Sequence, residues 1–306
     1  MLSGIQKKFE DLSTSDIFGT PQLYSYFLRT EFAKIGIETE SAPFSGVKEP
    51  GHVFRERLKL IPSGADHIVC LEQRAFYNRS QATFLVPEMK KLVPGKITTI
   101  CDNNDITGQE DMLYYAVPAK QKPKSLWVGW GADPTICRPD KDNRKIRILI
   151  DHSYYGSNRS RDMSDNIIND AAKFSLSNKN IEIRRFISGG IENLDINNLW
   201  KDKYNRSGLS FTDACKEYCA AHIFIVTHPE SMGLSVLEAA MSGALIVLPN
   251  GYIRHELIRD LNHIEYTGNI PWKVVLNRID PDKSRKMALK HTWSEVAGRI
   301  ASDLYK

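Results

Sequence analysis

The chain has 306 residues, of which 42% are hydrophobic and 25% carry a charge, and its formal net charge is +4. This composition is typical of globular proteins, and no apolar run approaches the roughly 18 residues of a membrane-spanning helix. The N-terminus lacks a signal-peptide core and the five cysteines are odd in number, so we expect a reduced, cytoplasmic protein. The length suits two α/β domains.

The first half of the chain shows one clear helix pattern and several short strand patterns. A loop at Asp16–Pro21 opens a predicted helix over Gln22–Ile35, whose apolar residues follow helical spacing and which ends at Gly36. Strands are expected at Ile37–Thr39, His67–Leu71, Thr83–Val86 and Lys96–Cys101.

A Gly- and Pro-containing stretch, Leu126–Pro139, leads to a predicted hinge at Pro139–Asn143. Strand and helix patterns then alternate, which favours a parallel sheet. Strands are expected at Lys145–Ile150 and Ile181–Ser188. Helices are expected after Asp151–Asp162 to near Phe174, from near Ser210 or Thr212, over Ser284–Leu289, and from Thr292 to Tyr305.

The stretch His222–Arg254 predicts a complete strand, turn, helix and strand. These parts occupy His222–Thr227, Thr227–Gly233, Leu234–Met241 and Ala244–Leu248. Pro229 ends the first strand, and Gly243 suits the left-handed position after the helix. The turn should lie at the carboxyl edge of the sheet, where open α/β sheets bind ligands.

Two glutamates in this stretch are unusual. Glu230 lies in the turn, and Glu238 lies within an otherwise apolar helix, between Leu237 and Ala239. A carboxylate buried there without a partner would cost several kcal/mol. We therefore expect Glu238 to face a polar ligand or a paired donor. The structural alternative is a helix-start acid and a rim acid on an ordinary Rossmann unit.

The Glu-x7-Glu spacing, in the frame His228-Pro-Glu-Ser-Met-Gly-Leu234 between two strands, resembles the donor-site signature of glycosyltransferase family 4. Enzymes of this family are retaining and have the GT-B fold. The resemblance implies an α/β protein with two Rossmann-like domains facing across a cleft and a C-terminal helix packing back on the N-terminal domain. The implied domains are residues 1–139 on the acceptor side, 140–290 for the nucleotide sugar, and 291–306 for the returning helix.

The resemblance also assigns donor-site roles. Glu230 lies against the donor sugar as the catalytic carboxylate, and Glu238 holds the ribose hydroxyls. The backbone that approaches sugar and phosphate belongs to Ser231, Met232, Gly233 and Leu234, at a helix start that favours anions. The loop expected to contact the base comprises Arg206, Ser207, Gly208 and Leu209.

The diphosphate requires fixed cations as its charge grows in the reaction. The family has an Arg-x4-Lys pair in the place where this chain has Arg159 and Arg161, so either arginine is a candidate, and Gly156 would let the backbone approach. The spacing departs from the family's pattern. The alternative is that both arginines pair with Asp162 and Asp165 at the helix start.

Two positions are candidates for the acceptor side of the cleft. Gly19 stands where the family has a glycine-rich loop, although it could equally cap the following helix. Asp102 directly follows the predicted strand Lys96–Cys101 and could contact sugar hydroxyls. The cluster Asp102–Asp105 has oxygen ligands for a divalent metal, but such clusters also form turns. Because the family generally uses no catalytic metal, we expect neither a metal nor a cofactor besides the nucleotide sugar.

The resemblance implies a hexosyltransferase that moves a sugar from a UDP- or GDP-type nucleotide sugar to a glycan, glycolipid or polysaccharide precursor. One alternative is a sugar-nucleotide enzyme of the epimerase type on the same scaffold. Another is a transferase acting on modified DNA, although no basic-aromatic interleaving of a nucleic-acid module is seen. Basic residues concentrate in the first half, which usually means solvated faces and otherwise peripheral membrane contact or an anionic acceptor.

Overall fold

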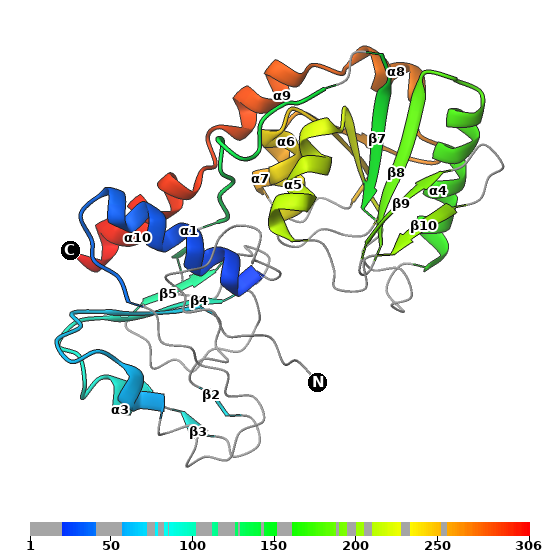
Figure 1. Cartoon of the computed structure of the whole chain (residues 1–306). Coiled ribbons are helices and arrows are strands. Elements are labelled where there is room, and N and C mark those ends of the chain that lie inside the picture. Colours follow the sequence, from blue (N-terminus) through cyan, green and yellow to red (C-terminus); the bar gives the residue numbers. More distant parts are fainter. Residues whose placement is uncertain are drawn as a thin grey trace. The chain divides into compact units, whose positions relative to one another are not determined.

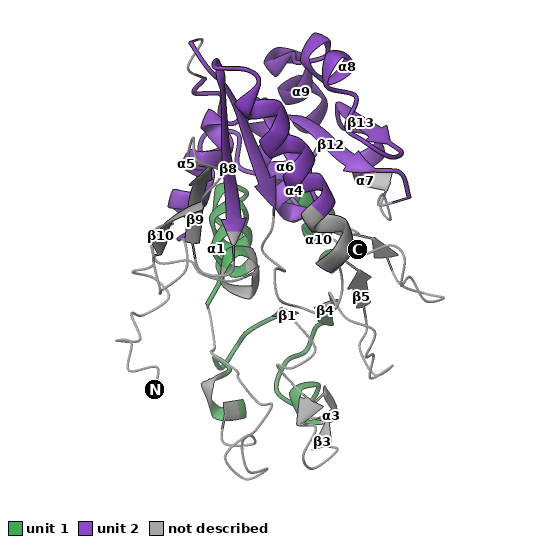
Figure 2. Cartoon of the chain, turned by 90° about the vertical axis from the view of Figure 1, so that its right-hand side faces the viewer, with its two compact units in different colours: residues 1–11, 19–129, 293–306 green, residues 12–18, 130–292 purple. Residues whose placement is uncertain are grey.

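A computed structural model of the chain describes part of each half of the sequence. The described residues are 20–40, 57–71, 77–78, 83–84, 86–101, 112–115, 126–127, 129–141, 144–151, 161–187, 190–194, 200–204, 210–227, 233–251 and 256–306. They form two compact units, shown in separate colours in Figure 2. Unit 1 holds the described residues from Thr20 to Gly129 and also Trp293–Lys306, whereas unit 2 holds Trp130–Thr292.

Unit 1 contains a four-stranded parallel sheet in the order β1-β4-β5-β6. Its strands are β1 (Ile68–Leu71), β4 (Ile97–Cys101), β5 (Met112–Tyr115) and β6 (Leu126–Trp127). The shorter elements are the 3-10 helix η3 (Arg57–Leu60), the antiparallel pair β2 (Tyr77–Asn78) and β3 (Thr83–Phe84), and helix α3 (Val86–Met89). A small core of Met89, Val93 and Ile97 packs against Ile68.

The first and last helices of the described chain pack together within unit 1, α1 (Thr20–Lys34) against α10 (Trp293–Leu304) (Figure 1). Each buries a stripe of apolar side chains at helical spacing. The stripe of α1 is Leu23, Phe27, Leu28 and Phe32, and that of α10 is Trp293, Val296, Ala297, Ile300 and Leu304. The C-terminal helix thus completes the core of the N-terminal unit.

The helix predicted over Gln22–Ile35 is found as α1, and the strands predicted at His67–Leu71 and Lys96–Cys101 are found as β1 and β4. The strand predicted at Ile37–Thr39 is wrong. Gly36 has φ +79°, and the amide of Ile37 donates to the carbonyl of Phe32 at 3.0 Å, so this residue closes the end of α1. The strand predicted at Thr83–Val86 is shorter, because α3 already begins at Val86.

Unit 2 contains a seven-stranded sheet in the order β10-β9-β8-β7-β11-β12-β13. Its strands are β7 (Ile146–Asp151), β8 (Ile181–Ile187), β9 (Gly190–Leu194), β10 (Trp200–Tyr204), β11 (Ile223–Val226), β12 (Leu245–Pro249) and β13 (His263–Tyr266). Five of them, from β8 to β13, are parallel, and β9 and β10 add an antiparallel hairpin at one edge. The parallel strands follow the chain order 2-1-3-4-5 of a doubly wound sheet.

Helices cover both faces of this sheet (Figure 1). They are α4 (Arg161–Leu176), α5 (Phe211–Ala220), α6 (Leu234–Met241), α7 (Glu256–Arg259), α8 (Trp272–Asn277) and α9 (Pro281–Ala288). On one face, Ile167 and Ile168 of α4 pack on alternate strand residues such as Ile148 and Ile183. On the other, the ring of Tyr218 in α5 meets that of Phe224 in β11, with centroids 5.7 Å apart.

Most predicted elements of unit 2 are found, including both strands of the stretch His222–Arg254. The hairpin β9–β10 and strand β13 were not predicted. Their sequences mix charged and apolar residues, as in WKDKY of β10, because strands at or next to an edge of the sheet need little burial. The unit boundary follows Gly129, within the Gly- and Pro-containing stretch Leu126–Pro139 and before the predicted hinge at Pro139–Asn143.

Candidate functional site

The chain order of the parallel strands in unit 2 reverses between β7 and β11. From β7 the chain passes through α4 to β8 on one side, and from β11 it passes through α6 to β12 on the other. In open α/β sheets this reversal leaves a ligand crevice outside the carboxyl ends of the two strands. The two strand ends lie side by side here, since Val226 is the register partner of Asp151.

The predicted donor-site residues belong to segments that leave these strands or neighbouring ones. Gly233, Leu234 and Glu238 begin or lie in α6, and Arg161 is the first residue of α4, with only its backbone described. The other predicted site residues lie outside the described part of the chain: Gly19, Asp102, Gly156, Arg159, Arg206, Ser207, Gly208, Leu209, Glu230, Ser231 and Met232. Their roles stay predictions.

Helix α6 is short and is flanked by two glycines, Gly233 directly before its first residue and Gly243 two residues after its last. Gly233 caps its start with φ 71° and ψ 21°, a left-handed conformation that glycine adopts without steric cost, and its carbonyl accepts from the amide of Leu237 at 2.7 Å. At the other end, Gly243 has φ +85°, as the sequence predicted. A Cβ on Gly243 would lie 3.0 Å from the Cβ of Pro281 and 3.1 Å from the Cγ of Pro139, so the two proline rings would have to shift to admit a side chain.

Glu238 is buried on α6, with only 4% of the residue exposed. Within the described part of the chain its Oε1 has no hydrogen-bond partner and its carboxyl forms no ion pair. Burial raises the pKa of Glu238 to about 8, so the carboxyl is mostly protonated at neutral pH. A buried polar atom of this kind requires a specific explanation, and contact with a polar ligand is one.

The groups around Glu238 that respond to its charge are thiols and a phenol. Burial raises the pKa of Tyr218 well above its ordinary value, and the charges of Glu238 and Asp151 add to this effect. The hydrogen bond with Cys137 and then burial raise the pKa of Cys215, whose Sγ lies 3.6 Å from that of Cys137. Because these groups stay neutral, they supply no counter-charge to the acid.

Asp151 was missed as a site residue by sequence reasoning. It is the last residue of β7, is 5% exposed, and has its Oδ2 3.3 Å from the Oγ of Ser235, which donates to it. Its carbonyl accepts a hydrogen bond from the hydroxyl of Thr227, just after β11. The signal was available in the sequence, since an acidic residue directly ends the apolar strand beginning at Ile146.

The segment Trp130–Lys141 is part of unit 2, and hydrogen bonds from two basic side chains connect it to α5, α6 and α9. The guanidinium of Arg285 donates to the carbonyls of Cys137 at 2.6 Å, Pro134 at 2.7 Å and Met241 at 2.8 Å. Met241 is the last residue of α6, so one side chain holds the helix end and the segment together. The ammonium of Lys141 donates to the carbonyl of Ala221 at the end of α5.

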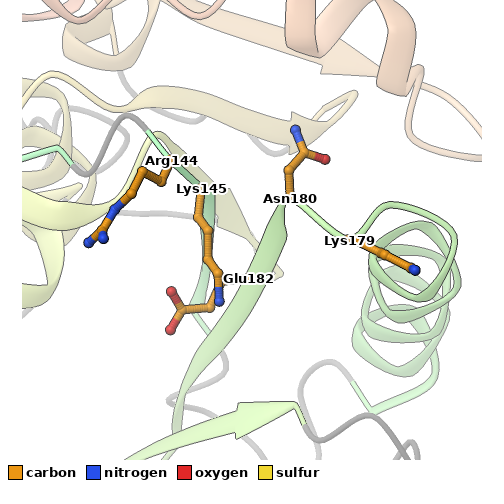
Figure 3. A pocket seen from close by; sticks show the side chains of 5 residues that line it. All are labelled: Arg144, Lys145, Lys179, Asn180 and Glu182. Atoms are coloured by element: carbon orange, nitrogen blue, oxygen red, sulfur yellow. The ribbon is translucent and has the colours of Figure 1, made fainter.

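A pocket of about 570 Å³ lies at the opposite edge of the sheet, at the starts of β7 and β8. Its lining residues are Arg144, Lys145, Lys179, Asn180 and Glu182. Figure 3 shows Arg144 and Lys179 extending to opposite sides, so these cations do not converge on one point. Glu182 is already bound by Arg147 and by Arg184, at 3.2 Å and 2.9 Å. The carboxyl ends of β7 and β11 therefore remain the stronger candidate site.

Neither a cluster of metal-ligating side chains nor a membrane-spanning helix is found among the described residues. No three or more His, Cys, Asp or Glu side chains are grouped there so as to hold a metal ion. The helices described include none that is both long and apolar enough to cross a membrane.

The sequence matches no protein-family model and no curated protein sequence. Solved structures resemble its fold. AviGT4, a glycosyltransferase involved in avilamycin A biosynthesis, has a TM-score of 0.57 and 11% identity, over 94% of this chain and 90% of that one. Sucrose-phosphate synthase from Thermosynechococcus elongatus has a TM-score of 0.56 and 11% identity over 94% of each chain. A putative UDP-N-acetylglucosamine 2-epimerase from Listeria monocytogenes has a TM-score of 0.57 and 12% identity over 93% of each chain.

At this level of identity the likeness concerns the fold. Both units have a parallel sheet, and the similarity to AviGT4 and to the other two proteins extends over nearly the whole chain. The predicted α/β fold class is confirmed: the chain has the GT-B fold, built from two Rossmann-like domains.

Proposed function

We propose that the chain is a glycosyltransferase whose sugar comes from a nucleoside-diphosphate sugar. The observation that carries this proposal is the buried carboxyl of Glu238, whose Oε1 lacks a described partner on the helix that follows the sheet's reversal point. The paired hydroxyls of a ribose are donors that would satisfy this oxygen, and their hydrogen bonds become charge-assisted when the carboxyl ionises on binding. The GT-B fold shared with AviGT4 supports the same reading.

In this proposal the remaining roles follow the sequence resemblance. Glu230 holds the hydroxyls of the transferred sugar, and Arg159 or Arg161 binds the diphosphate in place of a metal. Leaving diphosphate and incoming hydroxyl share one face of a hexose, so the configuration is retained. A fixed carboxylate and fixed cations favour such a reaction because they need no reorganisation as charge develops.

The proposed acceptor is a glycan, a glycolipid or a polysaccharide precursor, with Gly19 and Asp102 on the acceptor side. Arg206–Leu209 contacts the base of a UDP- or GDP-type donor. The expected place of action is the cytoplasm, with peripheral contact to a membrane where the acceptor is lipid-linked.

Calorimetry with UDP, GDP, dTDP and their sugar conjugates tests the proposal. At least one nucleotide should bind saturably, and Glu238→Gln should weaken it by about 10- to 100-fold, the equivalent of one charge-assisted hydrogen bond. Glu265→Gln, an exposed acid on β13 of the same unit, is the matched control and should bind as the wild type does. The proposal fails if no nucleotide binds the wild-type chain or if Glu238→Gln binds it equally well.

A second candidate is an epimerase acting on the nucleotide sugar itself. It is favoured by one observation: the putative epimerase from Listeria monocytogenes matches this fold with the same TM-score as AviGT4. Incubation with UDP-N-acetylglucosamine and no acceptor separates the two candidates. Appearance of the C2 epimer in the NMR spectrum would support the epimerase, whereas a transferase needs an acceptor to turn over.

A further inference from the structure

Asp151 lies where three segments of unit 2 meet. It ends β7, and its carbonyl accepts the hydroxyl of Thr227, the residue after β11. Its carboxylate Oδ2 accepts the hydroxyl of Ser235, the second residue of α6, at 3.3 Å. One residue therefore joins the ends of two neighbouring strands to the start of the helix that carries Glu238.

An acidic residue is costly at this position. Asp151 is 5% exposed and follows the buried residues Ile148, Leu149 and Ile150, so a small or apolar side chain would end the strand without desolvating a carboxyl. Buried carboxyl groups occur in protein cores where their hydrogen bonds are satisfied, because such bonds hold the neighbouring side chains in one arrangement.

The contacts of Asp151 also fix the direction of two hydroxyl groups. A carboxylate and a backbone carbonyl can only accept hydrogen bonds, so Ser235 and Thr227 must both point their hydrogens at Asp151. Neither side chain can then rotate freely, and the lone pairs of both oxygens face away from it. This arrangement holds the first turn of α6 in one place relative to β7.

We infer that Asp151 is a positioning residue of the proposed donor site, acting through Ser235 and Thr227. The inference rests on the proposed function, because the segments that it joins lead to Glu230, Glu238 and Arg159. A binding site is productive only while such groups stay within a fraction of an ångström of their places. Loss of this contact should therefore weaken nucleotide binding although Asp151 itself is not required to touch the nucleotide.

Calorimetry with UDP and with GDP tests this role on the intact chain. Asp151→Ala and Ser235→Ala should each weaken binding by about fivefold or more, the effect of one hydrogen bond. The double variant should be no worse than the weaker-binding single variant, because both changes break one contact. Thr227→Ser keeps the hydroxyl and should bind normally, whereas Thr227→Val should not.

Asp280→Asn is the matched control. Asp280 caps α9 by accepting from the amide of Lys283 at 2.9 Å, and asparagine caps a helix equally well, so nucleotide binding should be unchanged. Circular dichroism verifies that each variant is folded, and if Asp151→Ala does not fold, Ser235→Ala and the Thr227 pair carry the test. A merely structural role would lower the unfolding temperature without separating Thr227→Ser from Thr227→Val in binding.

The outcomes distinguish failure of the proposed donor site from failure of the positioning role of Asp151. If the wild-type chain binds neither UDP nor GDP, the proposed donor site fails and the inference fails with it. If the wild type binds but Asp151→Ala binds equally tightly, the inference is overturned and the donor site stands. If the effects of Asp151→Ala and Ser235→Ala multiply in the double variant, the carboxylate does not act through Ser235, which also overturns it.

Discussion

The indole of Trp293 lies parallel to the ring of Phe27, with centroids 5.3 Å apart and planes inclined by 6°. Phe27 belongs to α1 and Trp293 begins α10, and each is about 1% exposed. The ammonium of Lys96 adds a second tie, donating to the carbonyl of Asp303 at 2.6 Å. These contacts make the C-terminal helix an integral part of unit 1.

Trp293→Ala should destabilise unit 1 by about 3–5 kcal/mol, because it removes a fully buried aromatic side chain and leaves a cavity beside Phe27. Tyr305→Ala is the control, since Tyr305 is 62% exposed and its ring meets that of His67 in a T-shaped arrangement. Urea unfolding followed by circular dichroism measures both. Equal losses in the two variants would contradict the packing described for α10.

Arg285→Gln should lower the free energy of unfolding by about 3 kcal/mol, because three carbonyl groups lose a charged donor at once. Lys286→Gln changes the exposed neighbouring residue on α9 and should stay within about 0.5 kcal/mol of the wild type. Chemical denaturation of both variants provides the comparison. An Arg285→Gln protein as stable as Lys286→Gln would show that the three contacts contribute little.

Glu238 should make stability depend on pH. Its pKa is raised from an ordinary value of 4.5 to about 8, so the folded protein binds more protons than the unfolded chain between these values. The free energy of unfolding must then fall as pH rises through this window, by about 1.4 kcal/mol for each unit of pKa shift. Glu238→Gln cannot ionise, so its stability relative to the wild type should grow from pH 4.5 to 8 and level off above. A constant difference across this range would refute the raised pKa.

The two glutamates should affect kinetics differently. Glu238→Gln should mainly raise the KM for the donor, by a factor equivalent to about 1.5–3 kcal/mol of binding free energy. The reason is that the proposed ribose contacts act in ground and transition states alike. Glu230→Gln should lower kcat far more than it weakens donor binding, because the sugar contact matters most as positive charge develops on the ring. Steady-state kinetics with the donor found by calorimetry distinguishes the two. The reverse pattern would exchange the roles.

Turnover should survive a chelator, since arginines are proposed to neutralise the diphosphate. The measurement is activity in excess EDTA, with and without added Mn²⁺. Activity that disappears in EDTA and returns with Mn²⁺ would overturn metal independence and direct attention to Asp102 and Asp105.

The buried centre of unit 2 was the most predictable part of the fold. Strands β11 and β12 are continuous apolar runs, as expected where both faces of a sheet are covered, whereas β7 and β8 are apolar runs interrupted by charged residues. The edge strand β10, which lies beside β9 alone in the sheet, carries no such pattern. Ile37 shows a second limit of prediction from sequence. A β-branched residue after a glycine is typical of the start of a strand, but the amide of Ile37 closes the end of α1.

Two acidic residues of the candidate site differ in polarity from their neighbours in the sequence. Glu238 stands out in an apolar helix, and its burial agrees with that expectation. Asp151 is equally out of place after an apolar strand, but its partners Thr227 and Ser235 lie more than seventy residues away in the chain. Only the sheet topology, which sets β7 beside β11, brings them together.

Among the described residues the chain passes from unit 1 to unit 2 and back again, which has a consequence for synthesis. Unit 2 is encoded by a stretch that ends at Thr292, before any residue of α10 has been made. As domains fold as units on the ribosome, unit 2 can finish folding while α1 still exposes Leu23, Phe27, Leu28 and Phe32. The N-terminal unit is thus completed after unit 2. Until α10 has been synthesised, the apolar stripe of α1 stays exposed and can bind chaperones.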